Sequence, residues 1–407
     1  MKSSHFSISE LALRANPRYE LVLFDRLPAE QREMLKDFRK DPDFYGVLRP
    51  QDNFGLGAKS VSRDIALLYL TLQQPGKVPE YVRDRLGEQC DQEITRLVLD
   101  GVLAVEKDGK FLCGADAAEL FDTGNEEPSA FADAGGFLER LSLEALRYGQ
   151  TLGLKDSLTL SNRLYNYNRT PLSPHWKRTL AGPSAIVEYL GIQNGRNQEL
   201  LDREWSKIDD PVLNEGWFAW QSRRFGSSIS FGKPTRIGCK LYISPRTECL
   251  NDCFPIILAV LSECRVRHFK IGKVIQGLLR PDKIVAYFSS FEDLTATAEQ
   301  LKQKLGGYPA QGVPFTADIG DDGLLSWGVD PPAEGQVLPW IGRESWRLWV
   351  TNRLAVALIA TSTENTAKLE PWQFALRRLQ LEGVDTRIWT PAGTETKHSF
   401  ASETYSA

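Results

Sequence analysis

The sequence lacks a long apolar run. Its longest apolar stretch, Phe254 to Leu261, has eight residues and contains Pro255, whereas a membrane-spanning helix needs about 20. The N-terminal segment MKSSHFSISELALRANPRYE also lacks the continuous apolar core of a secretory signal peptide. We therefore expect a cytoplasmic protein that does not associate with a membrane.

Paired cysteine motifs are absent as well. The six cysteines include no C-x-x-C pair, and the spacing of the last four fits no common zinc framework. Because buried free cysteine behaves as a small hydrophobic residue, we expect these thiols to be reduced core residues. The absence of ligand motifs predicts a protein with no metal and no other cofactor.

Neither sign of charge is in large excess. The net charge is -4 and the isoelectric point is near 5.8, with 42% hydrophobic and 25% charged residues. These values are close to globular averages, so they exclude wholesale disorder and a nucleic-acid footprint spread over the whole surface. Any recognition of an anion must therefore be local.

The first third of the chain has the pattern of a small mixed domain. FYGVLR (44–49) predicts a strand, SVSRDIALLYLTLQQ (60–74) an amphipathic helix, and VPEYVRDRLG and DQEITRLVLDG two shorter helices. VLAVEKDGKFLCG then predicts a β-hairpin that turns at Asp108-Gly109. Three helices followed by a two-stranded wing are typical of a winged-helix domain.

A segment rich in small and acidic residues follows, from 114 to 136. It has no sustained periodicity, so we place a domain boundary near 125. This divides the chain into a winged-helix-like domain (1–125) and a second domain (126–407). Many winged helices bind DNA, but the expected recognition segment DQEITRLVLDG is acidic, and phosphate neutralisation requires lysine and arginine. We therefore expect no nucleic-acid partner.

The second domain is predicted to be α+β. GFLERLSLEALRYGQTLG predicts a helix, and CKLYIS, HFKIGK and KIVAYFSS predict three short strands. CFPIILAVLSEC and FEDLTATAEQLKQKL predict helices after the first and third of these strands. A hairpin turning around Asp321 to Gly323 and two helices, 343–361 and 369–382, complete the pattern. Because glycine flanks both carboxylates of GDDG, this motif indicates a turn rather than a metal site.

Strand alternation places particular polar residues together. Lys240 and Tyr242 share one face of the first strand, and His268 and Lys270 share one face of the second. In RVRHFKIGK (265–273) the arginines fall on the other face, with the apolar residues. If both apolar faces pack on one core, these four side chains line one groove. A single sequence does not show whether the two strands are neighbours.

Simpler interpretations remain open for each of these features. Strands with alternating lysine and arginine are usually solvated faces. Tyr242 is compatible with a packing role, with its hydroxyl at the surface. His175 is expected to be a loop residue beside Trp176, and Arg223-Arg224 and Arg343 to Arg353 are expected to lie on ordinary helix or loop surfaces.

Several segments resemble a known family. FKIGK, LLRPDKIVAYFSSFEDL, GYPAQGVPFTADIGDDGLLSWGVDPP, SWRLWVTNRLA and EPWQFALRRLQLEGVD are similar to the HopA-type effector family. The strand motifs also resemble phosphothreonine lyases and the lyase domains of class III and IV lanthipeptide synthetases. The resemblance covers roughly residues 150 to 391 and is specific over 237 to 391.

The resemblance implies roles for individual residues. Lys270 matches the family's base lysine, and Lys240 and Arg280 match its phosphate-binding cations; Lys273 joins the expected substrate-binding set. Tyr242 stands where the lyases have a general-acid histidine, which is a departure because tyrosine titrates near ~10. His268 replaces a lysine of the phosphothreonine lyases and is a second candidate for the acid.

The implied reaction is elimination of phosphate from phosphoserine or phosphothreonine, which gives dehydroalanine or dehydrobutyrine. The implied substrate is the phosphorylated precursor of a ribosomally made peptide natural product, a lanthipeptide for example. The sequence contains no glycine-rich loop, P-loop lysine or H-R-D motif, so a separate Ser/Thr kinase is expected to phosphorylate that peptide. The first domain resembles modules that bind leader peptides by strand addition.

Two other functions remain open. The chain is also compatible with a non-catalytic protein that binds a phosphopeptide or a kinase through the same cationic groove. A host-directed type III effector is the third possibility, although the additional first domain argues against it.

Overall fold

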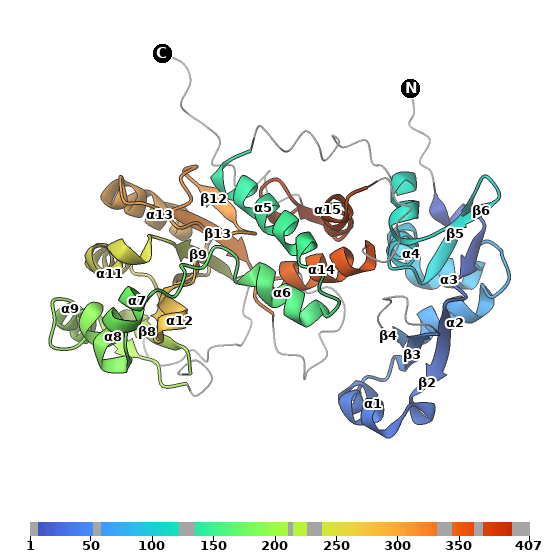
Figure 1. Cartoon of the computed structure of the whole chain (residues 1–407), viewed down its shortest axis with the longest axis horizontal. Helices are drawn as coiled ribbons and strands as arrows, with labels where there is room; N and C mark the ends of the chain where they lie inside the picture. Colours follow the sequence, from blue (N-terminus) through green and yellow to red (C-terminus); the bar gives the residue numbers. More distant parts are fainter. Residues whose placement is uncertain are drawn as a thin grey trace, which may run out of the picture.

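A computed structural model describes residues 7–51, 58–121, 135–210, 215–225, 238–331, 344–361 and 369–392. The chain is a mixture of helices and strands, as the α+β prediction requires. In Figure 1 the N-terminal part, coloured blue to cyan, lies at one end of an elongated molecule, and a large sheet lies at the other. Helices α5 (Phe137–Thr151), α6 (Ser157–Tyr165), α14 (Trp346–Thr361) and α15 (Pro371–Leu381) lie between the two ends.

The described N-terminal part contains two small antiparallel sheets, with strand orders β1-β5-β6 and β2-β3-β4. The strands are β1 (Leu13–Ala15), β2 (Tyr19–Leu23), β3 (Phe44–Pro50), β4 (Lys59–Ser62), β5 (Leu103–Lys107) and β6 (Lys110–Leu112). The helices are α1 (Ala29–Met34), α2 (Arg63–Thr71), α3 (Glu80–Leu86), α4 (Cys90–Leu99) and the 3-10 helix η5 (Gly114–Phe121).

The predicted order of three helices and a hairpin is confirmed here. Asp108 and Gly109 have φ values of 51° and 76°, as a two-residue hairpin turn requires. The helix predicted over 60–74 is shorter, because β4 occupies its beginning and the Ser62 hydroxyl caps α2 by accepting from the Ile65 backbone N–H at 3.3 Å. The three-residue strand β1 was not predicted. The winged-helix assignment itself stays a prediction.

The large sheet is antiparallel, with strand order β12-β13-β9-β11-β10-β8-β7. Its strands are β7 (Trp205–Lys207), β8 (Trp217–Ser222), β9 (Cys239–Ile243), β10 (His268–Gly272), β11 (Ile284–Phe288), β12 (Ala317–Ile319) and β13 (Leu325–Val329). A two-stranded sheet, β14 (Val384–Asp385) and β15 (Thr390–Pro391), lies near the end of the described chain. The three predicted strands and the hairpin are therefore confirmed, with Asp321 at a φ of 63° in the turn.

Helices cover this sheet and link it to the N-terminal part. α14 packs on α6 and α15, and α13 packs on α11, β9 and β11. The remaining helices of this part are α7 (Pro174–Thr179), α8 (Pro183–Tyr189), α9 (Gln198–Glu204), α11 (Leu250–Glu263), α12 (Ile275–Leu278) and α13 (Phe291–Leu305). The helices predicted over 136–153, 253–264, 291–305, 343–361 and 369–382 correspond to α5, α11, α13, α14 and α15 within the described residues. His175 lies on the short helix α7, not in a loop, with its ring 4.8 Å from that of Trp176.

One sheet face forms the main core, with Leu241, Phe269 and Ala286 among its buried residues. The N-terminal part has a second buried cluster, but Leu99 of α4 belongs to the main core, so the two parts pack together. The boundary predicted near 125 lies outside the described residues, and the division into two domains stays a prediction.

The six cysteines are free thiols; Cys90, Cys239 and Cys253 are buried and the other three are partly exposed. Burial raises the pKa of Cys253 to about 12, which makes this thiol unreactive at neutral pH. Among the described residues, no group of histidine, cysteine or acidic side chains is arranged to hold a metal ion. None of the helices in these ranges has the length and apolar character needed to cross a membrane.

Candidate active site

Four of the predicted polar residues share one face of the large sheet, opposite the main core: Lys240, Tyr242, His268 and Lys270. β11 lies between β9 and β10, so the strands that carry the predicted residues are not neighbours. The register places Lys240, Tyr287 and His268 in one cross-strand row, and Tyr242, Val285 and Lys270 in the next. With strands about 4.8 Å apart, Lys240 and His268 are separated by roughly 10 Å, and β11 contributes Tyr287 between them.

Lys270 occupies an unusual environment on this face. Its ammonium lies 4.2 Å from the centroid of the Trp217 ring and 5.7 Å from that of Tyr287. None of the described residues forms a hydrogen bond or an ion pair with it. Burial lowers the pKa of Lys270 to about 8; Asp282 opposes the shift, and Arg280 and Lys240 add to it. A large fraction of Lys270 is therefore neutral in mildly alkaline solution.

Next to Lys270 lies a buried network centred on Asp282, which is 3% exposed. Arg280 binds this carboxylate through two nitrogens, at 2.8 Å and 2.6 Å, and Arg347 reaches it at 2.8 Å. Tyr165 donates to the same carboxylate at 3.1 Å and accepts from Arg280 at 3.0 Å. Burial alone would raise the pKa of Asp282, but the two arginines hold it well below its usual range.

The geometry of Arg280 leaves part of its guanidinium available. Its Nε and Nη2 atoms are used by Asp282 and Tyr165, whereas Nη1 has no partner among the described residues. Its guanidinium carbon lies 5.1 Å from the centroid of the Trp217 ring, the ring that also contacts Lys270. Arg280 and Lys270 therefore both lie against the Trp217 ring.

The charges of this cluster do not balance. Lys270, Arg280 and Arg347 are grouped around one carboxylate, Asp282. Buried positive charge without a partner is costly, and a bound anion would neutralise it. Lys240, at the edge of the same face, is paired with Asp330 at 2.5 Å.

Tyr242 is brought to the predicted face but is only 3% exposed. Burial raises its pKa well above 10, and Tyr165 adds to the shift. A Cβ placed on Gly328 would lie 3.5 Å from its ring, which shows how closely the neighbouring strand packs on it. Tyr242 therefore keeps its proton in a closed environment, which weighs against the predicted role as proton donor.

The other two predicted residues differ in placement. His268 is partly buried beside Tyr287, and burial lowers its pKa, with a further contribution from Arg267, so it is mainly neutral at pH 7. Lys273 lies past the end of β10, with its ammonium 5.9 Å from the ring centroid of Phe218, a residue of the main core. The structure therefore does not bring Lys273 to the face that carries Lys270.

Sequence reasoning missed several residues of this site. The expectation that Arg347 lies on an ordinary surface was wrong, because this residue of α14 is completely buried. An arginine inside the apolar sequence SWRLWV was the available signal. Tyr287 could have been found by applying strand alternation to KIVAYF, and Asp282 by its position two residues after Arg280. Tyr165 and Trp217 gave no local signal.

The fold and the site define an α+β protein with a buried, net-cationic cluster that includes a lysine of lowered pKa. Neither a family model nor a curated protein matches the sequence. Among the solved structures that are similar to parts of the chain, three have low sequence identity and TM-scores below 0.5, so the roles proposed below rest on the geometry of the site.

Two of these structures are effector proteins from Pseudomonas syringae. The one from pathovar syringae strain 61 has 12% identity and a TM-score of 0.34, with 63% of this chain and 97% of that chain covered. The one from pathovar tomato strain DC3000 has 11% identity and a TM-score of 0.36, covering 63% and 98%. The third is a phosphothreonine lyase, with 14% identity and a TM-score of 0.25, covering 46% of this chain and 88% of that chain.

Proposed function

We propose that the chain is a lyase that eliminates phosphate from phosphoserine or phosphothreonine in a peptide, with Lys270 as the base. The observation that carries the proposal is the environment of Lys270: a pKa lowered to about 8, no hydrogen-bond or ion-pair partner among the described residues, and Arg280 nearby with a free Nη1. A general base works best when its pKa is near the working pH, and an elimination of phosphate requires cations beside the leaving group.

The proposed reaction breaks the Cα–H and Cβ–O bonds of the phosphorylated residue and forms a Cα–Cβ double bond. Neutral Lys270 removes the Cα proton, and the electrons of that bond form the Cα–Cβ double bond. The Cβ–O bond breaks, and the phosphate leaves with its electron pair. The phosphate takes up one proton, and Lys270 later loses the proton that it gained, so no net proton is consumed.

The cations around Lys270 have separate roles in this proposal. Arg280 binds a phosphate oxygen through Nη1 while Asp282 and Tyr165 fix the plane of its guanidinium. Lys240 supplies a second positive charge, which requires its ion pair with Asp330 to open or to be shared. Arg347 is too deeply buried to reach a substrate and holds Asp282 in place.

The departing phosphate also needs a proton. Of the two residues predicted to donate it, His268 is the more accessible, and its lowered pKa makes its imidazolium a stronger acid than an ordinary one. Tyr242 is closed off by its burial. We assign the role to His268 or to water, with the cations stabilising the departing phosphate.

We further propose that the substrate is the precursor of a ribosomally made peptide natural product, phosphorylated by a separate Ser/Thr kinase. The sequence resemblance supports this proposal. In the same scheme the N-terminal part contributes to binding the precursor, and the reaction takes place in the cytoplasm.

A synthetic phosphothreonine peptide tests the proposed chemistry. Incubation with the protein at about pH 8, near the pKa of Lys270, should release inorganic phosphate and leave a peptide lighter by one water than its unphosphorylated form. A product with the mass of the unphosphorylated peptide would indicate hydrolysis and overturn the proposal. Binding without any turnover would favour the second candidate, a non-catalytic phosphopeptide-binding protein, which the same net-cationic cluster could support.

A further inference from the structure

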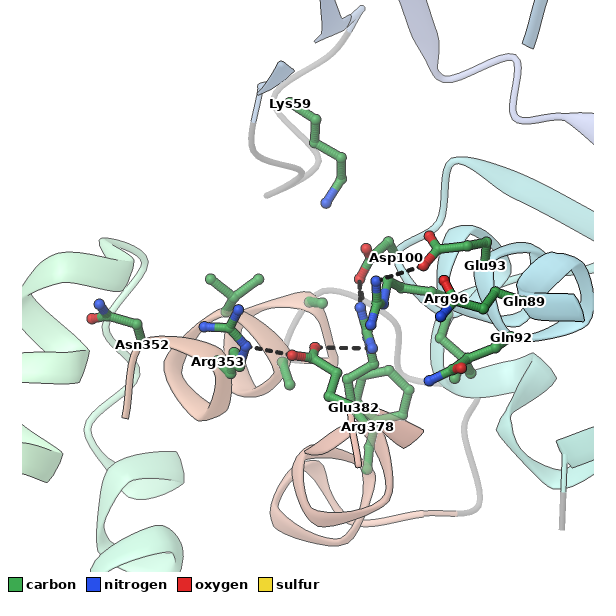
Figure 2. Close-up of a pocket in the computed structure, with 15 residues that line it drawn as sticks. Lys59, Gln89, Gln92, Glu93, Arg96, Asp100, Asn352, Arg353, Arg378 and Glu382 are labelled. Atoms are coloured by element: carbon green, nitrogen blue, oxygen red, sulfur yellow. Dashed lines mark hydrogen bonds and ion pairs between the residues drawn. The ribbon is translucent and has the colours of Figure 1, made fainter. Parts of the chain in front are cut away.

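A cleft of about 800 Å³ lies between α4 of the N-terminal part and helices α14 and α15 (Figure 2). It is separate from the face that carries Lys270, since none of the residues assigned to the proposed reaction lines it. Its volume falls within the range of sites that bind ligands, roughly 300–1,000 Å³. The proposed function gives this cleft no role.

The floor of the cleft is a chain of ion pairs, in which Glu382 and Arg378 each bind two partners. Arg353 binds Glu382, Glu382 lies 2.9 Å from Arg378, and Arg378 lies 3.0 Å from Asp100 (Figure 2). Because Asp100 follows α4 and the other three residues belong to α14, α15 or its C-terminal end, this chain joins the two walls. These ion pairs therefore tie the two walls together.

One cation of the cleft has no carboxylate partner among the described residues. Arg96 is paired with Glu93 at 2.9 Å, but the side chain of Lys59, at the start of β4, has no ion pair or hydrogen bond in the described part of the chain. Figure 2 shows its side chain extending into the space above the ion pairs. Four cations and three carboxylates line the cleft, so its excess charge is positive and is located at Lys59.

The remaining lining suits a polypeptide in an extended conformation. Gln89 presents a carboxamide, which donates to and accepts from peptide groups, and Gln92, whose Nε2 donates to the Leu381 backbone carbonyl at 3.3 Å, offers its amide oxygen as an acceptor. Val356 opposes them with an apolar side chain that is 47% exposed. α4 forms a wall of roughly 15 Å at ~1.5 Å per residue, which is the length of about four to five extended residues at ~3.3 Å each.

We propose that this cleft binds an extended acidic segment of the peptide substrate, distant from the phosphorylated residue, with one of its carboxylates on Lys59. The proposal rests on the proposed function, because the peptide is that of the lyase reaction. α14 connects the two places: Arg347 touches Asp282, and Arg353 lines the cleft six residues later, roughly 9 Å along the helix axis. The two sites therefore lie on either side of one helix segment.

A charge-swap experiment tests this site without any need for turnover. The probes are two fluorescein-labelled synthetic peptides, one with alternating glutamate and leucine and one with lysine in place of glutamate, measured by fluorescence anisotropy. The glutamate peptide should bind the full-length protein at least tenfold more tightly than it binds Lys59→Glu. Lys59→Glu should instead gain affinity for the lysine peptide.

The matched control is Lys155→Glu, which makes the same change at an exposed lysine that does not line the cleft. It should leave both affinities unchanged. Val356→Asp should weaken binding of the glutamate peptide severalfold, because the apolar contact is lost and a negative charge is added. Equal affinity of the glutamate peptide for the wild type, Lys59→Glu and Lys155→Glu, or no binding to the wild type, would overturn the proposal.

The two proposals can fail separately. If binding depends on Lys59 but no phosphopeptide is turned over, the lyase function fails and the cleft remains a peptide site. If phosphopeptides are turned over but binding does not depend on Lys59, the lyase function stands and the cleft assignment is wrong.

Discussion

The cluster around Lys270 and the chain of ion pairs Arg353–Glu382–Arg378–Asp100 in the cleft both hold arginines on carboxylates, but they balance charge differently. In the cluster Asp282 serves Arg280 and Arg347 together, and Lys270 has no ion-pair partner among the described residues. In the cleft Glu382 and Asp100 alternate with arginines along a chain. An excess cation with a lowered pKa, such as Lys270, suits chemistry on an anion. A chain in which each arginine is balanced by a carboxylate instead holds two parts of the fold together.

The largest effect is expected from removing the excess cation. Lys270→Ala should lower the rate of phosphate elimination by about 10³-fold or more, because a positioned general base contributes roughly 10²–10⁴-fold. Lys273→Ala is the matched control; it should change the rate little, since Lys273 lies near Phe218 of the core face. Release of inorganic phosphate under saturating peptide measures both. Nearly equal rates for the two variants would show that Lys270 is not the base.

Breaking the buried network should mainly affect folding. Asp282→Asn leaves Arg280 and Arg347 without their shared carboxylate, and removing one partner of a buried ion pair costs about 3–5 kcal/mol. Asp330→Asn removes a carboxylate that is 40% exposed, so a loss below about 1 kcal/mol is expected. Urea unfolding compares the two variants. A small loss for Asp282→Asn would mean that the network is not a structural centre.

The pH dependence should reveal the lowered pKa of Lys270. Elimination needs the neutral amine, so the rate should rise tenfold per unit up to about pH 8 and level off above it. The free energy of unfolding should also depend on pH. Between pH 8 and about 10.4 the Lys270 amine is protonated in the unfolded chain but not in the folded protein. The contribution of Lys270 to the free energy of unfolding therefore rises with pH in this range. Initial rates and unfolding curves at several pH values measure these effects, and a rate that still rises steeply towards pH 10 would contradict the lowered pKa.

A smaller loss of stability is expected when the chain of ion pairs in the cleft is broken. Asp100→Asn removes the carboxylate that Arg378 binds from the N-terminal part, and about 1–2 kcal/mol of stability should be lost because a partly buried hydrogen-bonded charge loses its partner. The rate of elimination at saturating peptide should not change. Thermal unfolding and phosphate release measure the two properties. If Asp100→Asn lowered the rate of elimination as much as Lys270→Ala does, the cleft could not be assigned a purely structural chain of ion pairs.

The sequence predicted the fold better than it predicted the site. Periodicity and turn chemistry located the main strands and helices because each depends on neighbouring residues: Asp108-Gly109 ended one strand, and alternation placed Lys240, Tyr242, His268 and Lys270 on one face. The short strand β1 was not predicted, because three residues are too few to show an alternation of polar and apolar side chains.

Contacts between distant segments could not be predicted in the same way. Tyr165 and Arg347 reach Asp282 from helices that are far from it in sequence, and no local pattern encodes such a meeting. Strand order had the same limit, since β11 lies between β9 and β10 although it follows both in the chain. The pairing of Asp100 with Arg378 likewise depends on how the N-terminal part packs on α15.

The most direct test of the central claim is the titration of Lys270 itself. In protein labelled with carbon-13 at the lysine ε-carbons, the Lys270 signal can be assigned by its absence from the Lys270→Arg variant. We expect it to titrate near pH 8 and to shift to higher pH when inorganic phosphate is added, because a bound anion stabilises the charged form. A titration near the ordinary lysine value of about 10.4, unaffected by phosphate, would contradict the account.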